Sequence, residues 1–282
     1  MAKILTTSLS FSPPACPNDD HGCIAAHIAL RHDAAYRETL LARLIAHAVE
    51  VEADVLLTPA GYFASGGPAD LPNVVATVQG LLGAAGANGL CVAFGVDGNT
   101  GGEERFSPDQ FMLAVTRTSV LGGARKASPA PGEEAYIPVG DPWALLTVGH
   151  DQVGRVFDHA GTRFSLAVCY DGLGPNHHGW AKPHGLNAVL NGIHWFFPYA
   201  PGKGDFYFAR GLASASWTWQ VPVLFSASFI CRLVPRRFPG GVMGFPWPEG
   251  KTTNRWKYGD NNLAPVGDDD LNRYIRTRTF ET

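Results

Sequence analysis

The sequence predicts an α/β sandwich, in which mixed β-sheets are covered by helices. Two observations carry this prediction: strands alternate with helices toward both ends of the chain, and the middle consists of strand-like runs joined by turns. The 282 residues contain no low-complexity linker, charge run or internal repeat that would mark a boundary. We therefore expect a single domain over residues 1–282.

The first part of the chain alternates short buried runs with amphipathic ones. Leu40, Leu41, Leu44 and Ile45 recur at helical spacing, and Pro59 closes a short apolar run that begins at residue 54. The predicted order is strand Lys3–Ser10, helix Ala34–Val51, strand Asp54–Thr58, helix Val74–Ala87 and strand Leu90–Val96.

Strands dominate the rest of the prediction. They cover Phe111–Thr118, Leu145–Val148, Val153–Asp158, Arg163–Cys169, Ala188–Asn191 and Pro222–Ser228, with one helix over Tyr207–Trp219. His159-Ala160-Gly161 is predicted as a hairpin turn. From about residue 232 the chain is rich in Pro, Gly, Arg and Trp, and we expect an irregular extension.

Composition excludes several classes of protein. A net charge of −3 offers no basic surface to nucleic acid, and no apolar run approaches the length of a spanning helix. The start of the chain lacks the long apolar stretch of a signal peptide, so a cytoplasmic location is expected. The five cysteines form no CxxC pair, and we expect neither a metal nor a cofactor. GxSxG and GxGxxG motifs are absent.

The run SLAVCYDGLG at residues 165–174 places a cysteine where a predicted strand ends. Cys169 is either a small core residue or a nucleophile held at a strand-to-loop corner, where a substrate can reach the sulfur. A nucleophile would need a partner that favours its thiolate and a donor for the oxyanion.

The segment GARKASPAPGEEAYIPVG at residues 123–140 supplies candidates for both needs. Lys126 follows a strand region, and Glu133-Glu134 lie in a Pro/Gly turn. A lysine buried beside a carboxylate and a thiol could stabilise charge and donate a proton. The alternative is a solvated lysine with surface glutamates.

These segments together resemble the carbon–nitrogen hydrolases of the nitrilase superfamily. The resemblance rests on RK followed by PGEEAY, on RFSLAVCYD, and on DVLLTPAGYF, NGIHW and the late helix and strand FARGLASASWTWQVPVLFSAS. It covers about residues 1–230 and implies a four-layer αββα sandwich that forms homodimers.

The resemblance also implies roles for individual residues. Cys169 would be the nucleophile, Lys126 and the backbone N–H of Tyr170 would stabilise the oxyanion, Glu133 would orient the lysine, and Asp171 would be structural. The implied chemistry is attack of the thiolate on a nitrile, amide or carbamoyl carbon, loss of ammonia or amine, and hydrolysis of a thioester.

One position departs from the family pattern. The general base of the family is a glutamate directly after the proline of the loop, whereas this chain has Pro59-Ala60-Gly61. An engineered change, a natural loss of hydrolysis and a different base all remain open. The candidates for a different base are Tyr62, Glu134, His184 and His194.

The substrate is expected to be a small molecule. Candidate binding residues are Tyr62, Phe63, Asn191, His194 and Trp195. The aromatic residues Tyr62, Phe63, Trp195 and Phe196 indicate either a flat or apolar ligand or packing in the core. Two functions are weighed: a hydrolase of small C–N substrates that uses Cys169, and a catalytically silent relative that acts in binding or assembly.

Overall fold

The computed structural model describes residues 1–10, 33–98, 107–130, 133–196, 215–229, 233–236, 238–243, 263, 265–272 and 274–282. Its helices are α2 (Ala34–Glu50), α3 (Leu71–Ala84), α4 (Gly174–His177) and α6 (Ala215–Thr218), with 3₁₀ turns η1 (Pro68–Asp70) and η2 (Cys169–Leu173). The strands are β1 (Lys3–Ser10), β2 (Val55–Leu57), β3 (Phe63–Ala64), β4 (Cys91–Gly98), β5 (Asp109–Val115), β6 (Val120–Arg125), β7 (Leu146–Val148), β8 (Asp151–Val153), β9 (Val156–His159), β10 (Thr162–Val168), β11 (Ala188–Phe196), β12 (Val223–Phe229), β13 (Gly240–Val242), β14 (Gly267–Asn272) and β15 (Ile275–Glu281).

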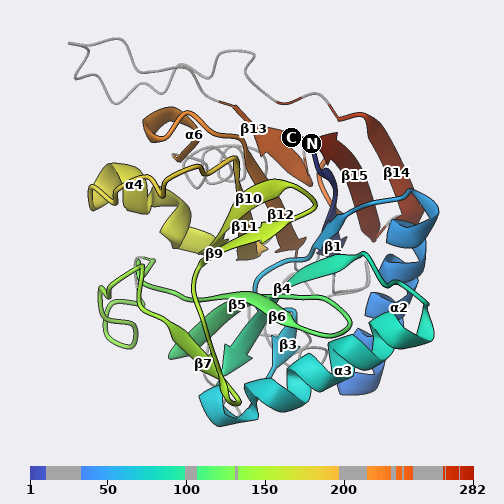
Figure 1. Ribbon diagram of the computed structural model, residues 1–282, viewed down its shortest axis with the longest axis horizontal. Helices are drawn as coiled ribbons and strands as arrows, with labels where there is room; N and C mark the ends of the chain where they lie inside the picture. Colours follow the sequence, from blue (N-terminus) through green and yellow to red (C-terminus); the bar gives the residue numbers. More distant parts are fainter. Residues whose placement is uncertain are drawn as a thin grey trace.

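The described strands form one large sheet that folds over on itself, and a separate hairpin, β7–β8. The sheet runs in the order β6-β5-β4-β2-β1-β12-β11-β10-β9. Side chains from both halves of this order meet in one apolar cluster, which includes Met112, Phe164 and Leu190. Helices α2 and α3 cover one outer face, whereas α4 and α6 lie on the other side (Figure 1). The predicted four-layer αββα arrangement is therefore confirmed.

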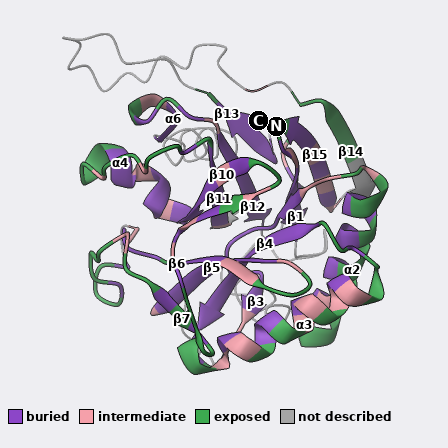
Figure 2. Ribbon diagram, in the orientation of Figure 1, coloured by how far each residue is buried: buried purple, intermediate pink, exposed green. Residues whose placement is uncertain are grey.

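Helix α2 begins where an aspartate caps it and buries the face that the sequence predicts. The side chain of Asp33 accepts a hydrogen bond of 2.9 Å from the N–H of Tyr36. Leu41, Leu44 and Ile45 are fully buried against the sheet, as the purple stripe of α2 in Figure 2 shows. No helix in the described ranges is long and apolar enough to cross a membrane.

Helix α3 begins three residues before the predicted Val74, and it ends at Ala84 rather than Ala87. Pro72 is tolerated in its first turn because the N–H groups there have no partner within the helix. Gly86, with φ of +65°, follows the end of the helix in a conformation that favours glycine.

The C-terminal region differs from the predicted irregular extension. Strand β15 pairs antiparallel with β1 along seven registered positions, from Lys3↔Glu281 to Leu9↔Ile275. Ile275, Thr277 and Thr279 alternate with residues of the other face, and all three are buried. This period of two was visible in the sequence, but arginines between these residues masked it. The predicted helix Tyr207–Trp219 lies largely outside the described residues, apart from α6.

Candidate active site

Cys169 occupies a strained corner at the end of strand β10. Its φ is +52°, which is uncommon for a residue other than glycine. Such backbone strain persists only where the surrounding structure enforces it. The amide of Asn191, on the neighbouring strand β11, donates a hydrogen bond of 3.2 Å to the carbonyl of Cys169. Residues 168–170, called here the cysteine corner, thus hold a buried thiol directly after the end of the strand.

Asp171 ties the cysteine corner to the segment that follows Lys126. One carboxylate oxygen accepts hydrogen bonds of 2.9 Å from the backbone N–H groups of Ala127 and Ser128. The other accepts from Arg155 at 2.8 Å and from the N–H of Val168 at 3.3 Å. Two segments distant in sequence are thereby held side by side through one buried carboxylate.

Removing this carboxylate should be costly. We expect Asp171→Ala to lower the free energy of unfolding by roughly 3–5 kcal/mol, because it leaves the Arg155 guanidinium buried without its charge partner. Chemical denaturation measures the loss. Asp158→Ala is the control, since Asp158 pairs with Arg163 at the surface, where such pairs contribute about 1 kcal/mol or less. Equal small effects in the two variants would contradict the structural role.

Lys126 and Glu133 form a buried ion pair beside the same segment. The Lys126 ammonium donates to Glu133 at 2.5 Å and to the Gln110 side chain at 2.9 Å. Gln110 in turn donates to the other carboxylate oxygen of Glu133 at 3.0 Å, and the N–H of Ala130 donates to the first at 2.7 Å. The ammonium is therefore oriented by two side chains, those of Glu133 and Gln110. This excludes the alternative of a solvated lysine with a surface glutamate at position 133.

The electrostatics of Glu133 follow from this pairing. Burial disfavours the carboxylate and so raises the pKa of Glu133. The charges of Lys126 and His194, together with the hydrogen bonds from Lys126 and Ala130, lower this pKa by more. The net result is a pKa of Glu133 below its usual value. Glu133 thus stays ionised at neutral pH and places a negative charge beside Lys126.

His194 lies near both charged groups and near Cys169. Its Nε2 is 3.0 Å from a carboxylate oxygen of Asp97, and both side chains are largely buried. Burial disfavours the imidazolium, but the charge of Asp97, its hydrogen bond and a hydrogen bond with Cys169 raise the pKa of His194 to about 9. The charge of Lys126 opposes this shift. His194 is therefore an imidazolium at neutral pH.

Ala60 is packed between the two halves of the sheet. It is only 2% exposed and belongs to the inner apolar cluster. A Cβ added at Gly95 would lie 2.3 Å from the Cα of Ala60, and one added at Gly192 would lie 2.9 Å from its nitrogen. Glycines on strands β4 and β11 thus permit the loop after β2 to approach both strands.

This packing predicts the result of restoring a glutamate. Ala60→Glu should lower the free energy of unfolding by roughly 1–3 kcal/mol, because a longer side chain is forced into a filled interior. It should not raise turnover. The measurements are melting temperature and ammonia release on one preparation, with Ala60→Ser as a small polar control. A tenfold gain in turnover at unchanged stability would show instead that the site still has room for a carboxylate.

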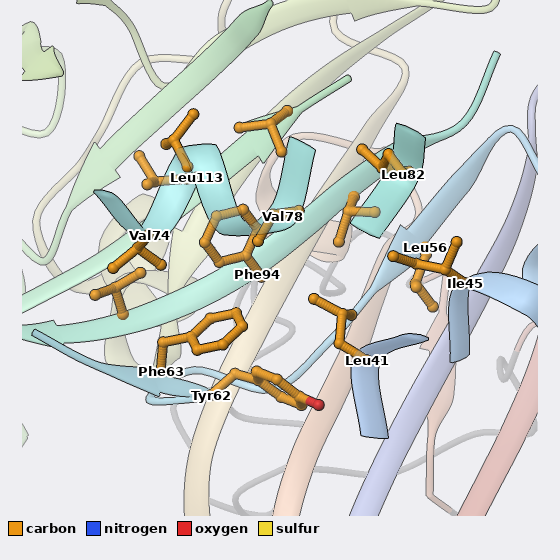
Figure 3. Close-up of a cluster of buried hydrophobic side chains, with 14 of the residues drawn as sticks. Leu41, Ile45, Leu56, Tyr62, Phe63, Val74, Val78, Leu82, Phe94 and Leu113 are labelled. Atoms are coloured by element: carbon orange, nitrogen blue, oxygen red, sulfur yellow. The ribbon is translucent and has the colours of Figure 1, made fainter. Parts of the chain in front are cut away.

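Tyr62 and Phe63 lie in the apolar core under the helices. The Tyr62 hydroxyl donates to the Arg37 carbonyl at 2.9 Å, burial raises the pKa of this phenol, and the two rings pack edge to face at 5.0 Å between centroids (Figure 3). Neither belongs to the cluster around Cys169. We assign both to packing, and not to substrate binding or proton transfer.

The remaining candidate site residues differ in how far they are buried. Glu134 and His184 are exposed, so neither has the buried setting of His194. The side chain of Trp195 lies outside the described residues. Of the five cysteines, Cys91 is the other one described; it is fully buried, and burial raises its pKa. Among the described residues, no group of His, Cys, Asp and Glu is arranged to hold a metal ion.

Three site residues were not predicted from the sequence: Asp97, Gln110 and Arg155. Each is a polar residue within or beside a strand, and each is buried. Asp97 follows the apolar run CVAFGV directly, which is a usable signal for a polar group at a strand end. Gln110 and Arg155 have no comparable signal, because their partners are distant in sequence.

The fold is that of amidases of the nitrilase superfamily. A variant of the amidase from Nesterenkonia sp. AN1, described as carrying acrylamide added at its active-site cysteine, matches with a TM-score of 0.56 and 16% identity over 100% of this chain and 93% of that chain. A second variant, described as an amidase from the nitrilase superfamily, matches with a TM-score of 0.57 and 16% identity over 99% and 90%. No protein-family model matches this sequence, and no curated protein matches either.

Proposed function

We propose that this protein is a carbon–nitrogen hydrolase in which Cys169 attacks a small amide, nitrile or carbamoyl substrate. The observation that carries the proposal is the Asp171 carboxylate, which binds the segment after Lys126 and the cysteine corner at once. Asp171 thus holds the segments that carry the Cys169 thiol and the Lys126 ammonium side by side. This arrangement suits an attack in which negative charge develops on the substrate oxygen. The amidases that share the fold support this reading.

Each residue has a defined part in the proposed reaction. The Cys169 sulfur attacks the carbonyl carbon, and the oxyanion binds Lys126 and the N–H of Tyr170. Glu133 and Gln110 keep the lysine oriented throughout. For an amide, loss of ammonia leaves a thioester, which water then hydrolyses. A nitrile instead gives a thioimidate, which must take up water before ammonia leaves. Asn191 supports the corner through the Cys169 carbonyl.

Selective labelling and product release test the proposal together. The protein is treated with limiting iodoacetamide, and modification of Cys16, Cys23, Cys91, Cys169 and Cys231 is followed by peptide mass spectrometry. We expect Cys169 to be alkylated fastest, and ammonia to be released from at least one member of a panel of short aliphatic and aromatic amides and nitriles. Equally slow labelling of all five thiols without ammonia release would favour a binding or assembly role instead.

A further inference from the structure

His194 is the extra residue of a β-bulge. Along β11 and β12 the register passes from Ile193↔Ala227 to Trp195↔Ser228, so two steps on β11 match one step on β12. Such a bulge bends the strand and redirects a side chain, and bulges are frequent beside active sites. The bulge lies one strand away from the cysteine corner, because β11 pairs with β10 up to Val168↔Gly192.

One ring nitrogen of His194 is engaged and the other is not. Nε2 is held by Asp97 at 3.0 Å, and Asp97 comes from β4 in the opposite half of the sheet. Nδ1 is buried and has no partner of good hydrogen-bond geometry among the described residues. The Cys169 side chain is nevertheless close enough for a hydrogen bond to affect His194. Catalytic hydrogen bonds are often poorly aligned before substrate binds.

Asp97 and His194 also lie close to the loop where the resembled family has its glutamate. A Cβ added at Gly61 would lie 2.7 Å from a carboxylate oxygen of Asp97 and 3.2 Å from the His194 ring. Gly61 has a φ of +60°, so this position favours glycine on two grounds. The pair therefore lies against the residue next to Ala60.

We propose that Cys169, His194 and Asp97 form a catalytic triad in which His194 performs the proton transfers that the glutamate absent at position 60 would perform. The inference rests on the proposed function and adds its acid–base residue. His194 is the catalytic acid and base, and Asp97 is a positioning residue that holds the ring from β4. The same division of roles, with a carboxylate orienting a histidine beside a nucleophile, recurs on unrelated folds.

For an amide substrate, every proton that His194 gives up in the reaction is returned to it by the end of the cycle. In the reacting form, Cys169 is a thiolate and His194 is an imidazolium. The sulfur forms a bond to the carbonyl carbon, and the π-electron pair moves to oxygen. The C–N bond then breaks as its electron pair and the imidazolium proton go to nitrogen, which releases ammonia and leaves a thioester with neutral His194. Water attacks the thioester and gives one proton to His194, and collapse releases the carboxylic acid and restores the thiolate.

The charges around His194 set the pH range of this cycle. Asp97 from β4 and the Cys169 side chain favour the imidazolium, Lys126 opposes it, and His194 in turn acts on Glu133, which follows β6. With a pKa of about 9, His194 carries its proton below that pH and loses it above. The assistance to the thiolate is therefore expected at pH 6–8 and should vanish above about pH 9, where a free thiol with a pKa of about 8.5 ionises unaided.

The test is the pH profile of Cys169 alkylation by iodoacetamide, read by peptide mass spectrometry, in the wild type, His194→Asn, His194→Gln and Asp97→Asn. At pH 6–7 we expect both His194 variants to be alkylated at least tenfold more slowly than the wild type, and Asp97→Asn several-fold more slowly. Above about pH 9 all rates should converge. His150→Asn, an exposed turn residue between β7 and β8, is the control and should follow the wild type.

The outcomes separate this inference from the proposed function. If Cys169 is alkylated no faster than Cys16, Cys23 or Cys231 in the wild type, the nucleophile itself is wrong. If labelling is selective but both His194 variants keep the wild-type profile, only the triad is overturned. Melting curves identify a variant that does not fold. In that case the wild-type profile alone decides. A rate of Cys169 alkylation that falls below pH 8, as it does for a free thiol, would overturn the triad.

Discussion

Cys169→Ala and Cys169→Ser are expected to abolish ammonia release and every covalent adduct that the substrate forms with the protein. Alanine has no nucleophile, and a serine hydroxyl is a far weaker one than a thiolate. Both side chains are smaller than or similar to cysteine, so the corner with its φ of +52° should persist. Turnover and intact-protein mass, measured on a substrate identified with the wild type, give the answer.

The control for this prediction is Cys91→Ala. Cys91 is the other described cysteine and lies fully buried on β4. Its loss removes core volume and should reduce stability while leaving turnover per folded molecule intact. Activity retained by Cys169→Ser, or lost equally in Cys91→Ala, would end the assignment of Cys169 as nucleophile.

Lys126→Met is expected to have the second-largest effect, and on two quantities. Turnover should fall by about 10²–10³-fold, the usual loss when one donor to an oxyanion is removed. The free energy of unfolding should also fall by roughly 3–5 kcal/mol, because Glu133 is left buried without its charge partner. Steady-state kinetics and chemical denaturation measure the two losses separately.

A double variant distinguishes catalysis from folding. Lys126→Met combined with Glu133→Gln removes both charges, and such a replacement of a buried pair restores much of the stability. We expect it to recover stability but not turnover. Recovery of both would mean that Lys126 serves only the fold, and would leave the oxyanion without its proposed side-chain donor.

The sequence predicted those parts of the site that depend on local pattern. A run of small and apolar residues ending at Cys169 was enough to place the strand and its corner, whereas the pairing of Glu133 with the lysine was implied only by the resemblance to the family. Spacing also identified the buried face of α2. In each case the neighbours along the chain carry the signal.

What the sequence did not reveal depends on contacts between distant residues. Nothing near Asp97 indicates that it faces His194, because the two meet only when the halves of the sheet pack together. The bulge that redirects His194 depends on the register with β12, and no local pattern encodes it. The sequence places Tyr62 and Phe63 directly after the loop of Ala60, which favours contact with a ligand, whereas their burial beneath α2 is a property of packing.

The pairing of β15 with β1 has a consequence for how the chain is made. Strand β1 is synthesised well before its partner along most of its length, which lies about 270 residues later in the chain, from Lys3↔Glu281 to Leu9↔Ile275. Until that partner emerges, one edge of a buried strand offers unpaired backbone groups, a template for association with other nascent chains. Contacts at such long sequence separation also slow folding. Shortening the chain by the length of β15 should therefore yield an aggregating product rather than a smaller folded one.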